Sequence, residues 1–218
     1  MFRTLGLTTI FSNPGSTEIP LLTDLPENFR FVLGLHEGAV VGMATGWAIA
    51  RGSPALVILH TTAGLGNAVG ALATARVNRA PLVVVVGQQD RRHLASEPFL
   101  TGHRLDLLGG DYPVWVDQPV RPQDVSGALA RAYHESEAGG GPALVIVPMD
   151  DWEAPHEVPA GTAAPERVFR GREAPPEAIA ELASLVDEAR NPAIVVGAGA
   201  DDRDTWSVLV TLAERLGG

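Results

Sequence analysis

Three side chains that can exchange protons or bind polar groups each stand at or just beyond the end of an apolar run. They are Ser16, Glu37 and His60. A carboxylate in apolar surroundings has a raised pKa, so Glu37 would suit proton exchange with a nitrogen atom of a ligand. The imidazole of His60 titrates near neutral pH and can move protons between groups. The three residues are therefore candidates for one acid–base site, if the fold brings them together.

Each of these residues also has a purely structural explanation. A serine after a turn commonly caps a helix, although Ile19 occupies the position where a capping box starting at Ser16 would need an acid. Glu37 in the first turn of a helix would be stabilised by the helix dipole by about 0.3–1 kcal/mol. His60 at a strand end can simply be hydrogen-bonded within the fold. A glycine at every fourth position after Glu37 would also let a flat ligand or a second backbone approach that helix closely; these are Gly38, Gly42 and Gly46.

The elements that must position these residues alternate along the chain. Strands are expected at 7–11, 29–35, 55–60, 82–86 and 143–147, and helices at 17–25, 37–50, 64–78 and 122–137. Near-continuous apolar runs are typical of strands that are covered on both faces. The alternation predicts an α/β fold built on a doubly wound parallel sheet. Because ligands bind beyond the carboxyl ends of such strands, the segments 13–16, 36–37 and 60–64 should meet at one rim of the sheet.

The second half of the chain is less regular. Residues 88–118 look like a charged connection, and the first domain is expected to span residues 1–152. Residues 153–176 hold five prolines and little apolar patterning, which indicates a linker over 153–175. A second unit follows at 176–218, with a helix at 176–190, a strand at 193–196 and a helix at 205–216. One strand and two helices cannot easily bury a sheet, so this unit is expected to be incomplete.

Composition excludes several classes of partner and chemistry. The 218 residues carry a net charge of −10, which argues against nucleic-acid and anionic-membrane partners. Cysteine is absent and all 16 basic residues are arginine, so thiolate nucleophiles, Cys-based metal sites and Schiff-base lysines are excluded. The histidines lack metal-ligand spacing, so no metal site is expected within the chain. No signal peptide and no apolar run of about 20 residues is present, so we expect a cytoplasmic protein.

Two glycine-rich stretches fail as nucleotide-binding fingerprints. In residues 64–70 the third glycine stands one place too late, and Val84 occupies the place of the expected acid. Residues 197–202 lack the third glycine altogether. A nicotinamide- or flavin-binding Rossmann protein is therefore disfavoured, and no Gly-x-Ser-x-Gly elbow of a serine hydrolase occurs.

Three rim segments together carry a family resemblance. FSNPGSTEIP at 11–20, LHEGA at 35–39 and LHTTAGLGNA at 59–68 resemble the benzoylformate decarboxylase family of thiamine-diphosphate enzymes. Similarity continues through 81–89, 97–101, 141–152 and 191–197, and so covers nearly the whole chain. This resemblance implies an N-terminal domain that binds the aminopyrimidine of the cofactor, a Rossmann-like central domain and a C-terminal domain that holds Mg²⁺ and the diphosphate. It also implies dimers that assemble into tetramers, with each active site between two subunits.

The resemblance carries over residue by residue. Glu37 matches the glutamate that hydrogen-bonds the pyrimidine N1′ and promotes its imino tautomer. Ser16 and His60 match residues that bind the carboxylate and carbonyl of the substrate and relay protons after carbon dioxide leaves. The remaining matches are Pro14, Gly15 and Asn67 at the cofactor, and Phe99 and Leu100 in the aryl pocket of the substrate, where Phe99 replaces a family leucine.

The chain also departs from the family pattern. The Gly-Asp-Gly motif that family members use for magnesium and diphosphate is absent from these 218 residues, so this piece alone is expected to be inactive. The resemblance implies a thiamine-diphosphate-dependent decarboxylase of a small-molecule 2-oxo acid such as benzoylformate, with carbon dioxide and an aldehyde as products. Two alternatives stay open: a related decarboxylase or carboligase acting on another 2-oxo acid, such as a branched-chain or phosphono substrate, and a non-catalytic pairing module that binds a partner through its glycine-striped helix.

Overall fold

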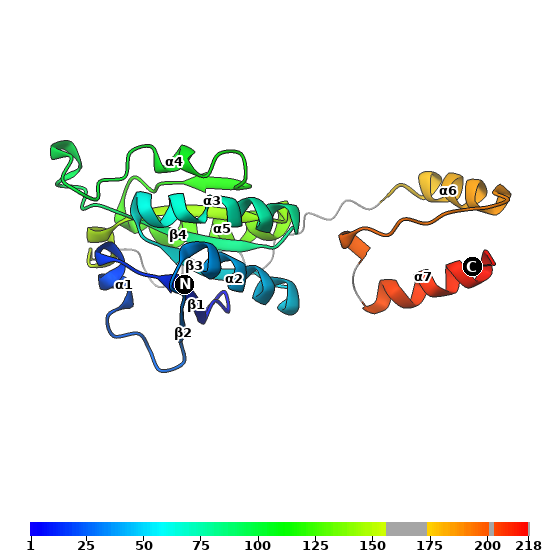
Figure 1. The fold of residues 1–218 in the computed structure, drawn as a ribbon, viewed down its shortest axis with the longest axis horizontal. Coiled ribbons are helices and arrows are strands. Elements are labelled where there is room, and N and C mark those ends of the chain that lie inside the picture. The colour runs from blue at the N-terminus through cyan, green and yellow to red at the C-terminus, as the bar shows by residue number, and fades with distance from the viewer. Residues whose placement is uncertain (156–173, 201–202, 218) are drawn as a thin grey trace. The chain divides into compact units, whose positions relative to one another are not determined.

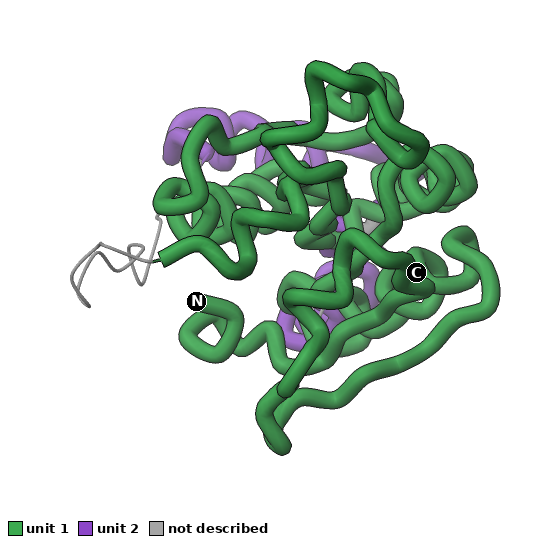
Figure 2. The backbone as a smooth tube through the Cα atoms, turned by 90° about the vertical axis from the view of Figure 1, so that its left-hand side faces the viewer, with its two compact units in different colours: residues 1–168 green, residues 169–218 purple. Residues whose placement is uncertain are grey.

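The computed structural model describes residues 1–155, 174–200 and 203–217. The chain divides into two compact units, residues 1–168 and 169–218, which Figure 2 distinguishes by colour. The division falls inside the predicted linker 153–175, most of which lies outside the described residues. The domain limits 1–152 and 176–218 therefore stay predictions.

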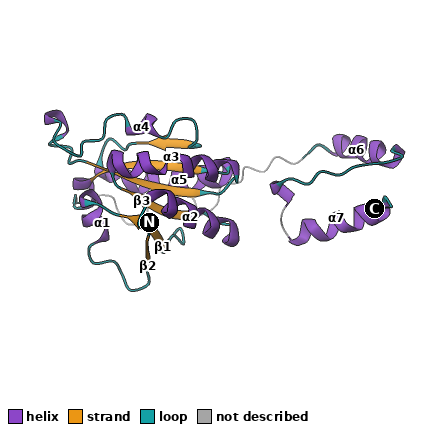
Figure 3. Cartoon of the chain, in the orientation of Figure 1, coloured by secondary structure: helices purple, strands orange, loops and turns teal. Residues whose placement is uncertain are grey.

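A parallel sheet forms the centre of the first unit (Figures 1 and 3). Its strands are β1 (Thr9–Asn13), β2 (Arg30–Leu33), β3 (Ala55–Leu59), β4 (Leu82–Gln88), β5 (Trp115–Asp117) and β6 (Pro142–Pro148). They lie in the order β2-β1-β3-β4-β6-β5, and every pair of neighbours runs parallel. The chain winds outward from the middle in both directions, which confirms the predicted doubly wound α/β fold.

Helices cover both faces of this sheet. The longer ones are α2 (Glu37–Arg51), α3 (Thr61–Val77) and α5 (Val125–Gly139), and α4 (Leu105–Leu108) adds one turn. Val57 and Leu59 of β3 pack in one cluster with residues of α2, α3 and α4, whereas Leu56 and Ile58 pack in a second cluster with residues of α5. Consecutive residues of a strand point to opposite faces, so this strand is buried along its whole length. The near-continuous apolar runs predicted to be covered on both faces are thereby confirmed for β3, β4 and β6.

Several boundaries differ from the prediction. The predicted helix at 17–25 is a 3-10 turn, η1 (Ser16–Glu18), followed by one helical turn, α1 (Ile19–Leu22). The helix predicted from residue 64 starts earlier, at Thr61. The strand β5 was not expected, because its three residues lie in a stretch interrupted by glycine and proline. β2 is largely exposed, since it forms an edge of the sheet.

Short 3-10 turns connect the larger elements of the first unit. They are η2 (Leu94–Ser96), η3 (Pro122–Asp124) and η4 (Met149–Trp152). Helix α2 is well terminated at both ends: the side chain of His36 accepts a hydrogen bond from the Gly38 N–H, and Gly52 ends the helix with φ of 62°. A left-handed residue at this position favours glycine. His36 therefore fixes the start of the helix that begins with Glu37.

The second unit contains α6 (Pro176–Glu188), η5 (Ala198–Ala200) and α7 (Arg203–Arg215). The strand predicted at 193–196 is wrong, because these residues pair with no strand in the described part of the chain. An apolar run forms a strand only where a neighbour can satisfy its backbone groups. Neither α6 nor α7 contains a buried residue. Across both units, none of the described helices combines the length and apolarity needed to cross a bilayer.

Candidate active site

The candidate site lies at the carboxyl ends of β1 and β3, where the winding of the sheet reverses. Asn13 is the last residue of β1, His60 follows β3, and the two strands are paired up to Asn13 and Leu59. Glu37 begins α2, the helix that crosses from β2 to β3. A reversal of this kind creates a crevice in which open α/β sheets bind ligands.

Glu37 is held by two asparagine side chains from different elements. Asn13 Nδ2 donates to Glu37 Oε1 over 3.0 Å, and Asn67 Nδ2, from α3, donates to Oε2 over 3.1 Å. Glu37 is buried, at 7% exposure. A carboxylate offers about four lone-pair sites, so the Glu37 carboxylate can still accept a hydrogen bond from a further donor. The predicted cofactor residues Glu37 and Asn67 are thus in direct contact.

The ionisation of Glu37 differs from the sequence-based expectation. Burial raises the pKa of this carboxyl, as expected, but hydrogen bonds from its own backbone N–H, Asn67 and Asn13 outweigh burial and leave the pKa below its ordinary value. The expectation of a raised pKa is therefore wrong. Amide donors stabilise the charged form more strongly than the apolar surroundings disfavour it. Glu37 is an ionised acceptor at neutral pH.

A second cluster surrounds His60 and includes a buried acid. His60 Nδ1 lies 3.1 Å from Glu18 Oε2 and 3.0 Å from Thr17 Oγ1. Glu18 is only 1% exposed, and its carboxylate also accepts hydrogen bonds from the Gly15 N–H, over 2.8 Å, and from the Thr17 hydroxyl. With acceptors around Nδ1, this nitrogen carries the proton and donates it toward Glu18. Nε2 has no hydrogen-bond partner among the described residues and is the ring nitrogen available to a ligand.

Two glycines make this cluster possible. A Cβ atom at Gly87, near the end of β4, would overlap Glu18 Oε1 and Thr17 Oγ1. A Cβ atom at Gly15 would overlap the ring of His60. Both positions therefore need glycine so that the buried acid and the imidazole can approach the backbone this closely.

The charge of Glu18 acts on His60. The hydrogen bond that His60 donates to Glu18 raises the pKa of His60, burial lowers it, and the negative charges of Glu18 and Glu37 raise it further. The net result is a raised pKa, so the imidazole stays protonated to a higher pH than a free histidine. Thr61, the next residue, adopts a φ of 40°. Left-handed backbone is unusual for a β-branched residue, and such outliers concentrate at functional sites.

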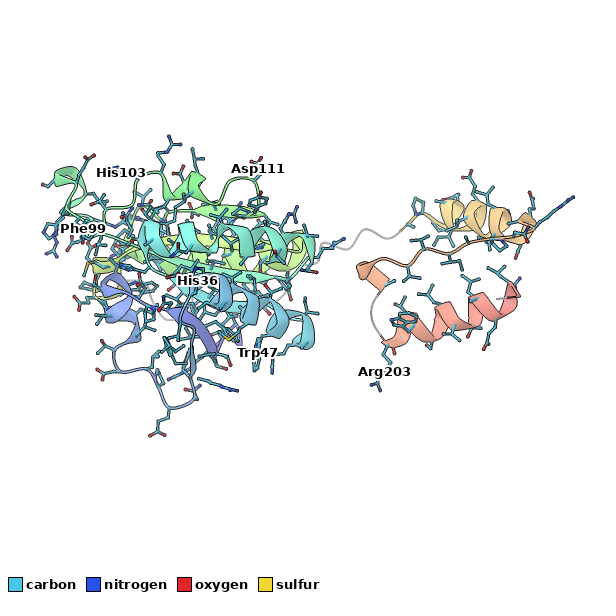
Figure 4. The ribbon with its side chains drawn as sticks, in the orientation of Figure 1. His36, Trp47, Phe99, His103, Asp111 and Arg203 are labelled. Atoms are coloured by element: carbon cyan, nitrogen blue, oxygen red, sulfur yellow. The ribbon has the colours of Figure 1, made fainter. Side chains whose placement is uncertain are left out.

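The other predicted residues lie around these clusters. Ser16 is exposed on η1 beside the buried Thr17, and Pro14 is exposed in the turn before it. Phe99 and Leu100 belong to the connection between β4 and α4, where Phe99 is 92% exposed. Figure 4 shows Phe99 at the outer edge of the first unit. The structure thus brings Glu37 to Asn67 and His60 to Gly15, but does not place Phe99 or Leu100 in contact with them.

Sequence reasoning missed Glu18, the most deeply buried acid of the site. It lies within the segment 11–20, but a capping box that starts at Ser16 has Ile19 at the acidic position. Counting from Gly15 instead places Glu18 there, and the carboxylate of Glu18 does accept from the Gly15 N–H. The sequence pattern also assigns no functional role to Asn13.

Two glycines of α2 face open space, and the described residues contain no cluster of metal ligands. Gly42 and Gly46 are exposed on α2, and a Cβ added at either would meet no atom of another element among the described residues. Within residues 1–155, 174–200 and 203–217, no three His, Cys, Asp or Glu side chains gather in a group that could hold a metal ion.

The chain resembles characterised enzymes over nearly its whole length. It is 42% identical to benzoylformate decarboxylase of Pseudomonas aeruginosa over 219 residues, which cover 99% of this chain and 41% of that protein. A solved thiamine diphosphate-dependent 4-hydroxybenzoylformate decarboxylase of Rhodococcus jostii RHA1 superimposes with a TM-score of 0.93 and 37% identity, over 99% of this chain and 41% of that one. The solved benzoylformate decarboxylase of Polynucleobacter necessarius superimposes with a TM-score of 0.90 and 36% identity, over 98% of this chain and 40% of that one.

These matches also fix how much of such a protein is in hand. The chain spans about two fifths of the length of these three proteins. Residues 1–106 match the family model of the thiamine pyrophosphate enzyme N-terminal TPP binding domain, and this range contains Glu37, Asn67 and His60. The chain therefore belongs to the thiamine-diphosphate-dependent enzymes, and within them it is similar to the benzoylformate decarboxylases.

Proposed function

We propose that this chain supplies the pyrimidine-binding half of the active site of a thiamine-diphosphate-dependent decarboxylase that acts on an aryl 2-oxo acid. The observation that carries this proposal is the ionised Glu37 carboxylate, oriented by Asn13 and Asn67 at the reversal of the sheet. Relatives named for benzoylformate and 4-hydroxybenzoylformate decarboxylation support the substrate class.

The residues around Glu37 fit an aminopyrimidine. The two asparagines fix both carboxylate oxygens, and the carboxylate can still accept a further N–H. Because the pKa of Glu37 is lowered, the proton shared with a ring nitrogen would reside on that nitrogen, which gives a charge-assisted hydrogen bond. Thiamine diphosphate, when bound, supplies the carbon nucleophile and electron sink that a 2-oxo acid needs to lose carbon dioxide.

His60 and Ser16 would act on the substrate. Glu18 holds Nδ1 of His60, so Nε2 is left to bind the carboxylate or carbonyl oxygen of the substrate and to deliver a proton after carbon dioxide leaves. The raised pKa favours the protonated imidazole, the form that suits both tasks. The exposed hydroxyl of Ser16 would donate to the same substrate carboxylate. Phe99 and Leu100 would line the pocket for the aryl group.

The proposal extends to the assembly. Mg²⁺ and the diphosphate would be held by the C-terminal domain of the family, and no residue of this chain is assigned to them. The active site would form between two subunits, within dimers that pair into tetramers. The compartment expected from the sequence is the cytoplasm, and fractionation of the source cells would check it.

The test is carbon dioxide release from benzoylformate by the full reading frame that contains this chain, with thiamine diphosphate and Mg²⁺ added. The Glu37→Gln variant should lose about 100-fold or more of kcat, because an amide cannot act as the ionised partner of the ring nitrogen. Glu27→Gln is the matched control, since Glu27 is an exposed acid outside the site. This control should retain full activity.

The possible outcomes separate the alternatives. Loss of turnover in Glu37→Gln alone supports the assigned cofactor chemistry. Binding of thiamine diphosphate without turnover of benzoylformate would keep the cofactor site and move the substrate to another 2-oxo acid. Full activity of Glu37→Gln would overturn the role proposed for Glu37. Absence of cofactor binding would overturn the proposed function and favour the non-catalytic pairing module.

A further inference from the structure

The connection from β4 to α4 is closed at its base by one buried side chain. Gln88, the last residue of β4, is 3% exposed. Its Nε2 donates to the Gly102 carbonyl over 2.8 Å, and its Oε1 accepts from the Gly102 N–H over 2.8 Å. Both bonds are made to the main chain, so Gln88 ties the two ends of residues 89–101 together. We call these thirteen residues the β4 loop.

The β4 loop is held in a conformation that its own residues disfavour. Leu100 has a φ of 80° and Glu97 a φ of 47°, both in the region that favours glycine. The hydroxyl of Thr101 is buried with no hydrogen-bond partner among the described residues. Each such feature is unfavourable by itself and persists only where surrounding contacts over-determine it. The paired hydrogen bonds of Gln88 are a restraint of this kind.

The β4 loop starts directly at the candidate active site. Gly87, which precedes Gln88, is the residue that packs against Glu18 and Thr17. The loop then carries Phe99 with its ring 92% exposed, and its backbone is tied once more by Gln89 Nε2, which lies 3.3 Å from the Phe99 carbonyl oxygen. An exposed aromatic side chain on a restrained loop is suited to contact a ligand, because little conformational freedom is lost on binding.

We propose that Gln88 is a positioning residue for substrate specificity: its clamp on Gly102 sets where Phe99 and Leu100 stand relative to His60. This inference rests on the proposed function, because it assumes that the β4 loop contacts the aryl group of the substrate. Gln88 itself contacts no substrate. Its removal should therefore impair binding of an aryl 2-oxo acid while the acid–base residues Glu37 and His60 stay in place.

The test compares two substrates in the full reading frame that contains this chain. Gln88→Leu keeps the size of the side chain but removes both hydrogen bonds. We expect kcat/KM for benzoylformate to fall about tenfold or more, mainly through KM, and kcat/KM for pyruvate, whose methyl group cannot reach an aryl pocket, to change little. Gln118→Leu is the matched control, because Gln118 is exposed and lies outside the β4 loop. It should leave the ratio of the two values unchanged.

A second variant keeps the proposal falsifiable if Gln88→Leu fails to fold. In Gln88→Glu, one oxygen can still accept from Gly102 N–H, but the other faces the Gly102 carbonyl oxygen and repels it while ionised. Protonation restores the missing donor. The discrimination between benzoylformate and pyruvate should therefore be reduced near pH 8 and recover as the pH falls toward about 5.5, relative to the wild type at each pH.

The outcomes distinguish this inference from the proposed function. An unchanged ratio in folded Gln88→Leu, or an equal loss with both substrates, would show that Gln88 serves only the fold and would overturn the inference. A wild-type protein that turns over no 2-oxo acid would overturn the proposed function, and the specificity role with it. The inference is supported if the ratio of kcat/KM for benzoylformate to that for pyruvate is lower in Gln88→Leu than in the wild type. In Gln88→Glu the same ratio should be low near pH 8 and recover at low pH.

Discussion

Different partners set the charges of Glu37 and His60 in opposite directions. Amide donors outweigh burial and lower the pKa of Glu37, whereas the buried carboxylate of Glu18 raises the pKa of His60. The result is a carboxylate whose charged form is favoured and an imidazole whose protonated form is favoured, both at the carboxyl-end rim of one sheet. In the proposed function, Glu37 would act as the acceptor for the cofactor and His60 as the donor for the substrate.

The ionic link between Glu18 and His60 gives a prediction about pH. Because the pKa of His60 is raised in the folded state, the stabilisation that it provides is complete below its ordinary pKa of about 6.5 and is lost as the pH rises through the raised value. Glu18→Gln removes the hydrogen-bonded charge, so the titration midpoint of His60 should fall. NMR of the imidazole protons in the 218-residue chain would measure this shift.

The stability of the same variant provides an independent readout. The free energy of unfolding of the wild type, measured with urea, should fall as the pH rises from about 6.5 through the raised midpoint of His60. In Glu18→Gln this free energy should depend less on pH over the same interval. Glu27→Gln changes an exposed acid, so the titration midpoint of His60 and the urea unfolding profile should be the same as in the wild type. An unaltered His60 midpoint in Glu18→Gln would contradict the assigned partnership.

At the residue scale, sequence pattern found the reactive groups but not what tunes them. Position after an apolar run was enough to single out Glu37 and His60. The direction of the pKa shift at Glu37 could not be inferred, because it depends on amides from Asn13 and Asn67 that only the fold brings close. Glu18 escaped notice because an acid near a helix start usually serves the helix.

At the scale of elements, the end of β4 packs directly against the turn that carries Thr17 and Glu18. Its glycine at position 87 accommodates the 3-10 turn η1 (Ser16–Glu18), so the strand and the turn fit only without a side chain there. The position of η1 in turn fixes Glu18 against His60. A larger side chain at this position of β4 should therefore displace η1 and weaken the contact between Glu18 and the imidazole of His60.

Gly87→Ala tests this close approach. The added methyl group overlaps the carboxylate of Glu18 and should push η1 outward, with a loss of stability of about 1–3 kcal/mol and a lower titration midpoint for His60. Gly42→Ala is the control of opposite sign, because Gly42 lies in α2 with open space around it and alanine favours helix by about 0.5–1 kcal/mol. Thermal unfolding of both variants measures the difference. Equal behaviour of the two would contradict the packing argument.

Elements followed from the sequence where burial and length were sufficient. The strands β3, β4 and β6 are buried throughout, and their uninterrupted apolar runs predicted them. β5 has only three residues, too few to give a periodic signal, and it exists because β6 offers an edge to pair with. The reverse holds for residues 193–196, whose apolar character predicted a strand although no neighbour is available in the described residues.

At the scale of the whole first unit, side chains tie together segments that are distant in sequence. Arg91 reaches Asp151 through two hydrogen bonds, Nε to Oδ1 over 2.7 Å and Nη2 to Oδ2 over 2.6 Å. Arg91 Nη2 also donates to the Pro119 carbonyl, and its backbone N–H donates to Asp150. Arg91, near the start of the β4 loop, therefore joins this loop to the residues that follow β5 and to the turn η4.

This convergence should make Asp151 important for unfolding of the first unit as a whole. The side chain of Asp151 is fully buried, and that of Arg91 is one quarter exposed. Asp151→Asn leaves the guanidinium without its counter-charge, so the free energy of unfolding should fall by about 2–3 kcal/mol, seen as a lower urea midpoint with an unchanged slope. Asp124→Asn breaks the exposed pair with Arg121 and should leave the midpoint unchanged, because water screens that pair. If both variants shifted the midpoint equally, burial would not be what gives the Arg91–Asp151 pair its effect.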